Sequence, residues 1–212
     1  MIQKLVLVED TVRKADETDE RLSFWKIILL TFVTCGIYGL IAQFKLLNWR
    51  DKHFSRKATL FKDIVECIKE VANEKGKLSA INQELLQLER LRDDEIFKPR
   101  NAVLWFILGL LGIPGFYSLY YLTTDYPAHE VKEYEAARLI SDMLTKLGIA
   151  KNPIEYEKVM IQRSFITYLL LSLITVGIFA IYWMYILEEE PNKHFDSEKR
   201  WEHQILAVLR SV

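Results

Sequence analysis

The sequence predicts an all-α protein that is integral to a membrane and built from three tandem copies of one unit. Hydrophobic residues make up 50% of the 212-residue chain and charged residues 27%, and the two classes are segregated. Three blocks, at 24–44, 102–122 and 165–187, are almost free of charge, whereas the stretches between them are rich in Lys, Glu, Asp and Arg. A bilayer imposes this separation because a charge placed in hydrocarbon costs kilocalories per residue.

Internal repetition is the second observation. When Gly36, Gly112 and Gly177 are aligned without a gap, equivalent residues fall at equal offsets in all three copies. The shared positions are Ile37/Ile113/Ile178, Gly39/Gly115/Ala180, Phe44/Tyr120/Tyr185, His53/His129/His194, Ile64/Ile140/Ile205 and Ile68/Leu144/Leu209. We therefore expect membrane repeats at 21–69, 97–145 and 162–212, a polar N-terminal segment at 1–20, a cytoplasmic helical insert at 70–96 and a linker at 146–161.

Each apolar block is long enough for one helical crossing of a ~30 Å hydrocarbon core, yet a Gly lies near its middle. Pro114 follows in the second copy and removes a backbone donor, and Thr34 and Thr175 are placed to bond carbonyls that a break would free. Two geometries remain open, a re-entrant hairpin and a kinked single span. Cationic residues before the third block, such as Lys158 and Arg163, favour hairpins, because hairpins keep every polar segment on the cytoplasmic side.

After each block we expect a separate amphipathic helix. Ser55 and Asp196, at the same offset in two copies, are suitable N-cap residues for it, and the apolar residues that follow recur at helical spacing. The insert carries a similar stripe, formed by Leu78, Ile81, Leu85 and Leu88. That stripe either closes on the preceding helix or binds a partner.

The glycine-centred segments resemble a known family. The stretch at 30–38 reads LTFVTCGIY, and the stretch at 173–185 reads LITVGIFAIYWMY. Both are similar to the tandem T-x-G-I-Y-x-x-Y-W-x-Y signature of a prokaryotic membrane domain of unknown function. The third copy fits best, since the first lacks the Tyr-Trp pair and the second has Pro114 after the isoleucine. The resemblance implies a membrane location and no established activity.

The histidines are the sharpest chemical candidates in the sequence. His53, His129 and His194 occupy one offset and would converge if the copies pack around a pseudo-threefold axis. Three imidazoles suit a zinc-like ion or a proton-linked switch. The favoured interpretation is that each His lies at the membrane interface, so we expect no metal and no other cofactor.

Other candidate residues concern packing and lipid contact. Small residues near each break, together with Pro114, are expected to let helices approach closely between copies or subunits: Gly36, Gly39, Gly112, Gly115, Gly177 and Ala180. Cations after the first block are placed to meet anionic headgroups: Lys45, Arg50, Lys52, Arg56 and Lys57.

The sequence excludes several functional classes. The net charge of −1 gives no general attraction to nucleic acid. No nucleophile–base set, phosphate-binding loop or paired acid stands out, so we do not expect an enzyme. The expected function is an integral scaffold or accessory subunit of a cell-membrane complex, which docks partners or a second copy of itself through cytoplasmic amphipathic helices. The alternative is an oligomeric pore or a membrane-perturbing effector.

Overall fold

The computed structural model describes residues 2–212, except for the side chains of Ile2, Ile113 and Pro114. The described part is mostly helical and contains no strand. Its elements are α1 (Ile2–Arg13), α2 (Ala15–Thr18), α3 (Phe24–Val33), α4 (Ile37–Glu74), η1 (Leu78–Ile81), α5 (Asn82–Arg92), η2 (Glu95–Phe97), α6 (Ala102–Gly109), α7 (Ile113–Lys146), α8 (Phe165–Ile174) and α9 (Ile178–Arg210). The all-α prediction is confirmed.

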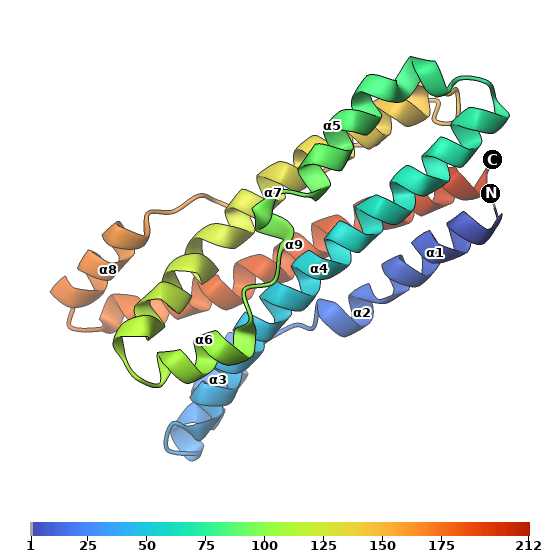
Figure 1. The fold of residues 1–212 in the computed structure, drawn as a ribbon. Helices are drawn as coiled ribbons and strands as arrows, with labels where there is room; N and C mark the ends of the chain where they lie inside the picture. Colours follow the sequence, from blue (N-terminus) through green and yellow to red (C-terminus); the bar gives the residue numbers. More distant parts are fainter. Residues whose placement is uncertain (1) are drawn as a thin grey trace.

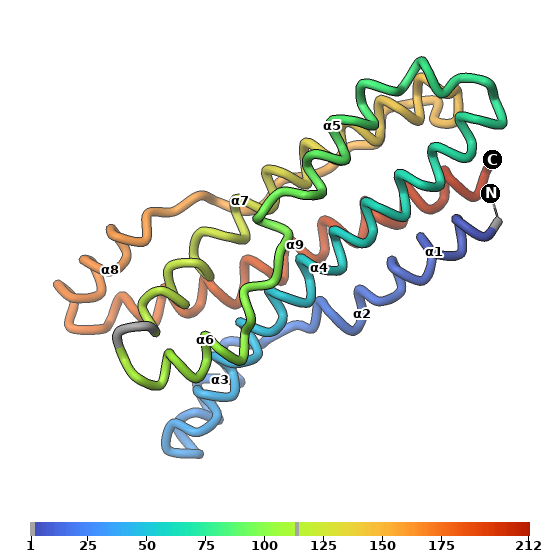
Figure 2. The backbone as a smooth tube through the Cα atoms, viewed as in Figure 1, coloured from blue at the N-terminus to red at the C-terminus, as the bar shows by residue number. Residues whose placement is uncertain are grey.

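The three copies have the same local fold, a short helix, a tight turn and a long helix: α3–α4, α6–α7 and α8–α9. The long helices α4, α7 and α9 run side by side along the molecule (Figure 1). All three hairpin turns lie at one end, and both chain termini lie toward the other end (Figures 1 and 2).

The turns form at the aligned glycines because the backbone there adopts positive φ, which glycine tolerates without a Cβ clash. The φ angles are 96° at Gly36, 90° at Gly112 and 88° at Gly177. In two copies a threonine bridges the break. The Thr34 hydroxyl donates to the Leu30 carbonyl and accepts from the Tyr38 N–H, and Thr175 makes the equivalent pair of bonds.

The small residues three positions after each turn serve packing within a hairpin. A Cβ on Gly39 would lie 3.1 Å from the Thr31 side chain, and one on Gly115 would lie 3.3 Å from the Gly109 carbonyl oxygen. Ala180 is half-buried at the equivalent place. The predicted role of Pro114 falls on a side chain outside the described residues.

The long helices differ from the sequence expectation in one respect. The second half of each apolar block and the following amphipathic stretch form one continuous helix, of 38 residues in α4 and 33 in α9. Ser55 and Asp196 therefore lie inside helices, and their prediction as N-caps is wrong. The helices begin instead at the glycine turns, and Pro191 is accommodated within α9.

The half of the bundle away from the hairpin turns has a conventional apolar core. The stripe of the insert is part of it, since Ile81, Leu85 and Leu88 are buried there, and α5 packs on α4 and α7. Of the two alternatives for that stripe, the structure shows closure within the chain. The N-terminal segment is not merely polar, because α1 buries Val8 and Val12 along α4 and α9.

The prediction of an integral membrane fold is wrong. Within residues 2–212, the structure contains no helix that is both long and apolar enough to cross a bilayer. The glycine turns are the physical reason, since they reverse the chain in the middle of each apolar block. One half becomes a short helix of 10, 8 or 10 residues, and the other half is joined to a charge-rich helical remainder.

Candidate functional site

The equivalent positions of the three long helices bring their polar residues together at one level of the bundle. His53, His129 and His194 are all fully buried and neighbour one another, with ring centroids 5.3 to 6.1 Å apart. The repeat predicted, as one of two alternatives, that the three histidines converge. The structure confirms that they do. Their placement at a membrane interface is wrong, because tertiary packing encloses them.

Two carboxylates join the histidines from the next helical turn. Glu133 and Glu198 lie four residues after His129 and His194 and therefore share a helix face with them. We call His53, His129, Glu133, His194 and Glu198 the His–Glu cluster; each offers a ligand atom, and these atoms all lie within 4.8 Å of one another. These are the residues of the described chain that could hold a metal ion.

Lys57 occupies the position in the first copy that Glu133 and Glu198 occupy in the other two. Its Nζ lies 3.0 Å from Glu133, 3.3 Å from Glu198 and 3.0 Å from Glu202. Burial disfavours the ammonium, but these three carboxylates outweigh that effect and raise the pKa of Lys57 above its ordinary value. Lys57 is therefore a fixed internal cation.

Segments outside the repeats complete the surroundings of the cluster. Asp19, which follows α2, accepts a hydrogen bond from Nδ1 of His53 at 2.8 Å. The extended segment after α7 contributes the Tyr156 hydroxyl, which donates to Glu133 at 3.0 Å. Glu130 accepts from the backbone N–H groups of residues 159 and 160 and lies 3.2 Å from Nδ1 of His194.

Burial and charge act in opposite directions on the cluster histidines. Burial disfavours the imidazolium of His53, but Glu198 and Asp19 outweigh it and raise the pKa of His53. The pKa of His194 is raised for the same reason, with Glu198 as its main partner. At His129 burial dominates over Glu133 and lowers the pKa to about 4.

A second polar layer lies nearer the hairpin turns and centres on Arg50, which is fully buried. Arg50 donates to Asp125 from Nε at 3.0 Å and from Nη2 at 2.6 Å, and Arg100 binds the same carboxylate. Asp51 accepts from the backbone N–H groups of Arg100 and Ala102. This layer fixes α4 to α7 and to the segment that leads into α6.

These two layers decide which predicted headgroup contacts remain available. Arg50, Arg56 and Lys57 are buried in ion pairs, so they do not reach a lipid surface. Their burial follows from the packing of α4 against α7 and α9, which the sequence did not reveal. Lys52 is exposed and Lys45 half-buried.

The end of the molecule that carries the hairpin turns has an apolar surface. The exposed fraction is 84% for Phe32, 73% for Leu111 and 92% for Val176, one residue from each hairpin. We call this surface the apolar end; its other exposed members are Trp25, Leu29, Val33, Ile37, Leu40, Ile41, Val103, Leu104, Ile107, Leu110, Phe116, Ile166, Leu170, Leu173, Ile174, Ile178 and Ile181. Exposed apolar side chains gathered at one end of a protein mark a site of contact with a protein partner or a membrane.

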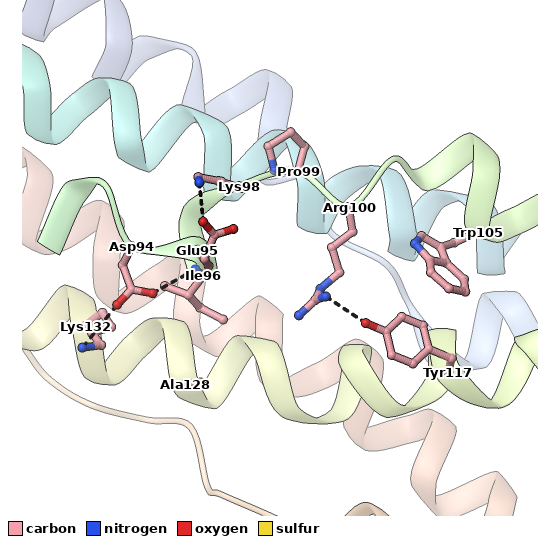
Figure 3. A pocket seen from close by; sticks show the side chains of 10 residues that line it. All are labelled: Asp94, Glu95, Ile96, Lys98, Pro99, Arg100, Trp105, Tyr117, Ala128 and Lys132. Atoms are coloured by element: carbon pink, nitrogen blue, oxygen red, sulfur yellow. Dashed lines mark hydrogen bonds and ion pairs between the residues drawn. The ribbon is translucent and has the colours of Figure 1, made fainter. Parts of the chain in front are cut away.

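Several cavities lie outside the His–Glu cluster, among them two with contrasting linings. An apolar one of about 330 Å³ lies near the turns and is lined by residues of all three long helices, including Gly39, Gly115 and Met184. An open surface pocket of about 560 Å³ lies beside η2 and α7. Its charged groups already have partners, as Figure 3 shows for Arg100 with the Tyr117 hydroxyl and for Lys132 with Asp94.

Sequence reasoning missed the carboxylates and the lysine of the cluster, although a signal was present. Lys57, Glu133 and Glu198 all lie twenty-one residues after their aligned glycines. Extending the alignment by that one position would have found them. The contributions of Asp19, Glu130 and Tyr156 carry no repeat signal, since they come from single segments or from one copy.

The geometry defines a class of protein, namely a bundle of three helical-hairpin repeats with a buried polar centre and an apolar end. In comparison with known families, a domain of unknown function (DUF4234) matches residues 163–212, which is the third copy. No curated protein and no solved structure matches the chain. The resemblance is thus supported for the third copy, as a likeness to a domain of unknown function.

Proposed function

We propose that this chain is a scaffold or accessory subunit that attaches to one face of a lipid bilayer through its apolar end and presents its helical body to partner proteins. The observation that carries the proposal is the exposure of large apolar side chains on all three hairpins. The hairpins themselves lie at one end of the molecule (Figure 1). Such attachment buries the apolar surface in the interfacial part of one leaflet. It needs no helix that crosses the membrane.

The residues next to the apolar end support lipid over a protein partner. Aromatic side chains with polar tips are exposed on the hairpins, among them Tyr117, Tyr120, Tyr182 and Tyr185, and such rings favour the headgroup level. The exposed cation Lys26 lies in the first hairpin, where it would meet anionic headgroups.

The scaffold part of the proposal concerns the helical body. The apolar stripes of α4, α5, α7 and α9 are used within the core, so partners would meet the polar faces of these helices. The proposal includes a prokaryotic origin and a tandem signature that the third copy fits best and the first two copies fit in part.

Vesicle flotation tests the attachment. Purified chain is mixed with phosphatidylcholine vesicles, with or without phosphatidylglycerol, and the bound fraction is measured. Wild-type chain is expected to float with both, and more strongly with the anionic lipid. The triple variant Phe32→Glu, Leu111→Glu, Val176→Glu should bind at least about 100-fold more weakly, since burying each side chain of this size is worth roughly 1.5–3 kcal/mol.

The matched control changes exposed apolar residues elsewhere on the surface, Val6→Glu, Leu86→Glu and Val131→Glu. This control is expected to float like the wild type. If the wild type stays unbound, or if both triple variants lose binding equally, the attachment through the apolar end is rejected. Recovery of a stoichiometric partner with the wild type from mild detergent supports the scaffold role, and repeated recovery of the chain alone counts against it.

A further inference from the structure

We propose that the His–Glu cluster binds one divalent transition-metal ion of the zinc class, and that this ion has a structural role in joining the three repeats. The donors are three imidazoles and two carboxylates, drawn from all three long helices. Imidazole and carboxylate together suit zinc and its first-row neighbours.

The distances within the cluster match those between ligands of one ion. Nε2 of His194 lies 3.1 Å from Glu198 Oε1 and 3.3 Å from Glu133 Oε2, and Nε2 of His129 lies 3.2 Å from Glu133 Oε1. Adjacent ligands of a tetrahedral ion with ~2.1 Å bonds are about 3.4 Å apart. All five ligand atoms lie within 4.8 Å of one another, so the wider pairs would draw together by up to about 1.4 Å around an ion.

The same atoms lack hydrogen-bond partners although they are buried. Nε2 of His53, both ring nitrogens of His129, Nε2 of His194, Oε1 of Glu133 and both carboxylate oxygens of Glu198 have none within the described structure. Buried polar atoms are normally paired, because leaving them unpaired costs free energy. Glu133 Oε1 and Glu198 Oε1 do lie 3.0 and 3.3 Å from the ammonium of Lys57. The remaining lone-pair atoms, which face one another, are the arrangement that a further cation would satisfy.

Neighbouring carboxylates hold two of the imidazole rings in the way that they hold histidines bound to metal ions. Nδ1 of His53 is held by Asp19 and Nδ1 of His194 by Glu130, so Nε2 of each ring is directed into the cluster. A carboxylate behind a ligand histidine fixes the ring and increases its basicity. His129 is held differently, by stacking on Phe54 with centroids 3.8 Å apart.

The charge around the cluster is unbalanced without an added cation. The interconnected groups include the carboxylates of Asp19, Glu130, Glu133, Glu198 and Glu202, opposed by the fixed cations Arg56 and Lys57. A divalent ion supplies two of the three missing positive charges. The competing source is protonation of His53 and His194, which the experiment below separates from metal binding.

Burial determines the role of the ion. Each of the five cluster side chains is at most 1% exposed, so a bound ion has no route for exchanging a solvent molecule with a substrate. Closed sites of this kind are structural. Its ligands come from α4, α7 and α9, so binding would couple the three copies as the chain folds.

Metal content after refolding tests the proposal. The full chain is unfolded in chelator, refolded in mild detergent with or without zinc, desalted, and its zinc content measured by elemental analysis; cobalt(II) serves as a spectroscopic substitute. Wild-type chain is expected to retain about one ion and to unfold at a higher temperature than the metal-free chain. His203→Ala, which changes the exposed histidine outside the cluster, should behave like the wild type.

His129→Ala and Glu198→Gln are expected to lose the ion, and Asp19→Asn to bind it 10–100-fold more weakly, as is typical of residues behind a ligand. His129→Ala removes a buried ring that stacks on Phe54, so the nearly isosteric Glu198→Gln serves as the second, less disruptive variant. The proposal is overturned if refolded wild-type chain holds no zinc and gains no thermal stability from it. It is equally overturned if the folded His129→Ala chain retains the ion.

Discussion

Replacement of Lys57 by methionine tests the charge balance of the buried centre directly. Methionine keeps most of the apolar stem and removes the ammonium, which lies 3.0, 3.3 and 3.0 Å from Glu133, Glu198 and Glu202. Glu202 retains Arg56, whose Nη1 lies 2.9 Å from both of its oxygens. Glu133 and Glu198 lose their only fixed cation among the described ion pairs.

The expected loss of stability follows from these contacts. At an effective dielectric constant of about 20, each 3 Å contact corresponds to roughly 5 kcal/mol of attraction before desolvation. Removing one partner of a buried pair costs a net of about 3–5 kcal/mol. For a chain of this length, that loss corresponds to a fall in the melting temperature of roughly 6–20 °C.

Urea unfolding in the presence of chelator, followed by circular dichroism, measures the effect. Lys52→Met is the matched control, since Lys52 is an exposed lysine of the same helix; it should change stability by less than about 0.5 kcal/mol. The double variant Lys57→Met, Glu133→Gln should lose at least about 1 kcal/mol less than the sum of the single variants. Two results would refute the conclusion that Lys57 stabilises the buried carboxylates. One is a loss of unfolding free energy below about 1 kcal/mol for Lys57→Met, and the other is strict additivity of the Lys57→Met and Glu133→Gln losses.

Three further predictions use the same unfolding assay. Gly177→Ala should cost about 1–2 kcal/mol because its φ of 88° is unfavourable for any residue with a Cβ, whereas Gly109→Ala, in α6, should be neutral or slightly stabilising; equal effects would contradict the role of the turn. Burial and the charge of Glu189 raise the pKa of Glu188 to about 7, so the folded state favours the neutral acid. Stability should therefore fall as the pH rises from about 4.5 through about 7, and Glu188→Gln should remove that part of the pH dependence; an unchanged slope would exclude Glu188 as its source. Ile140→Ala, at a fully buried core position, should cost about 2–5 kcal/mol, and a loss under 1 kcal/mol would contradict the packing of α7.

The local structure of each copy followed from the sequence. The glycine alignment located all three turns, and the hydroxyls of Thr34 and Thr175 bond across the break as expected. These features are local, since they depend on backbone conformations and hydrogen bonds within a few residues. The limits of the amphipathic helices were wrong because no local signal opposed continuation of the helix from the turn.

The prediction of an integral membrane fold, built from re-entrant hairpins or kinked spans, failed for a related reason. Segregation of apolar from charged residues showed where an apolar surface would form, and the apolar end is that surface. Hydropathy alone does not show whether a glycine kinks a helix or reverses it. Reversal at Gly36, Gly112 and Gly177 shortened each apolar helix below the length needed to cross a bilayer.

The sequence by itself determined the repeat, the turn positions and the equivalence of His53, His129 and His194, because each is a property of spacing along one chain. Only the tertiary structure decided which charged residues are inside. Lys52 and Lys57 belong to the same basic stretch of α4, yet Lys52 is exposed and Lys57 is enclosed by carboxylates of α7 and α9. The reason is that burial of a charge depends on partners from other helices, and those partners are set by packing between helices.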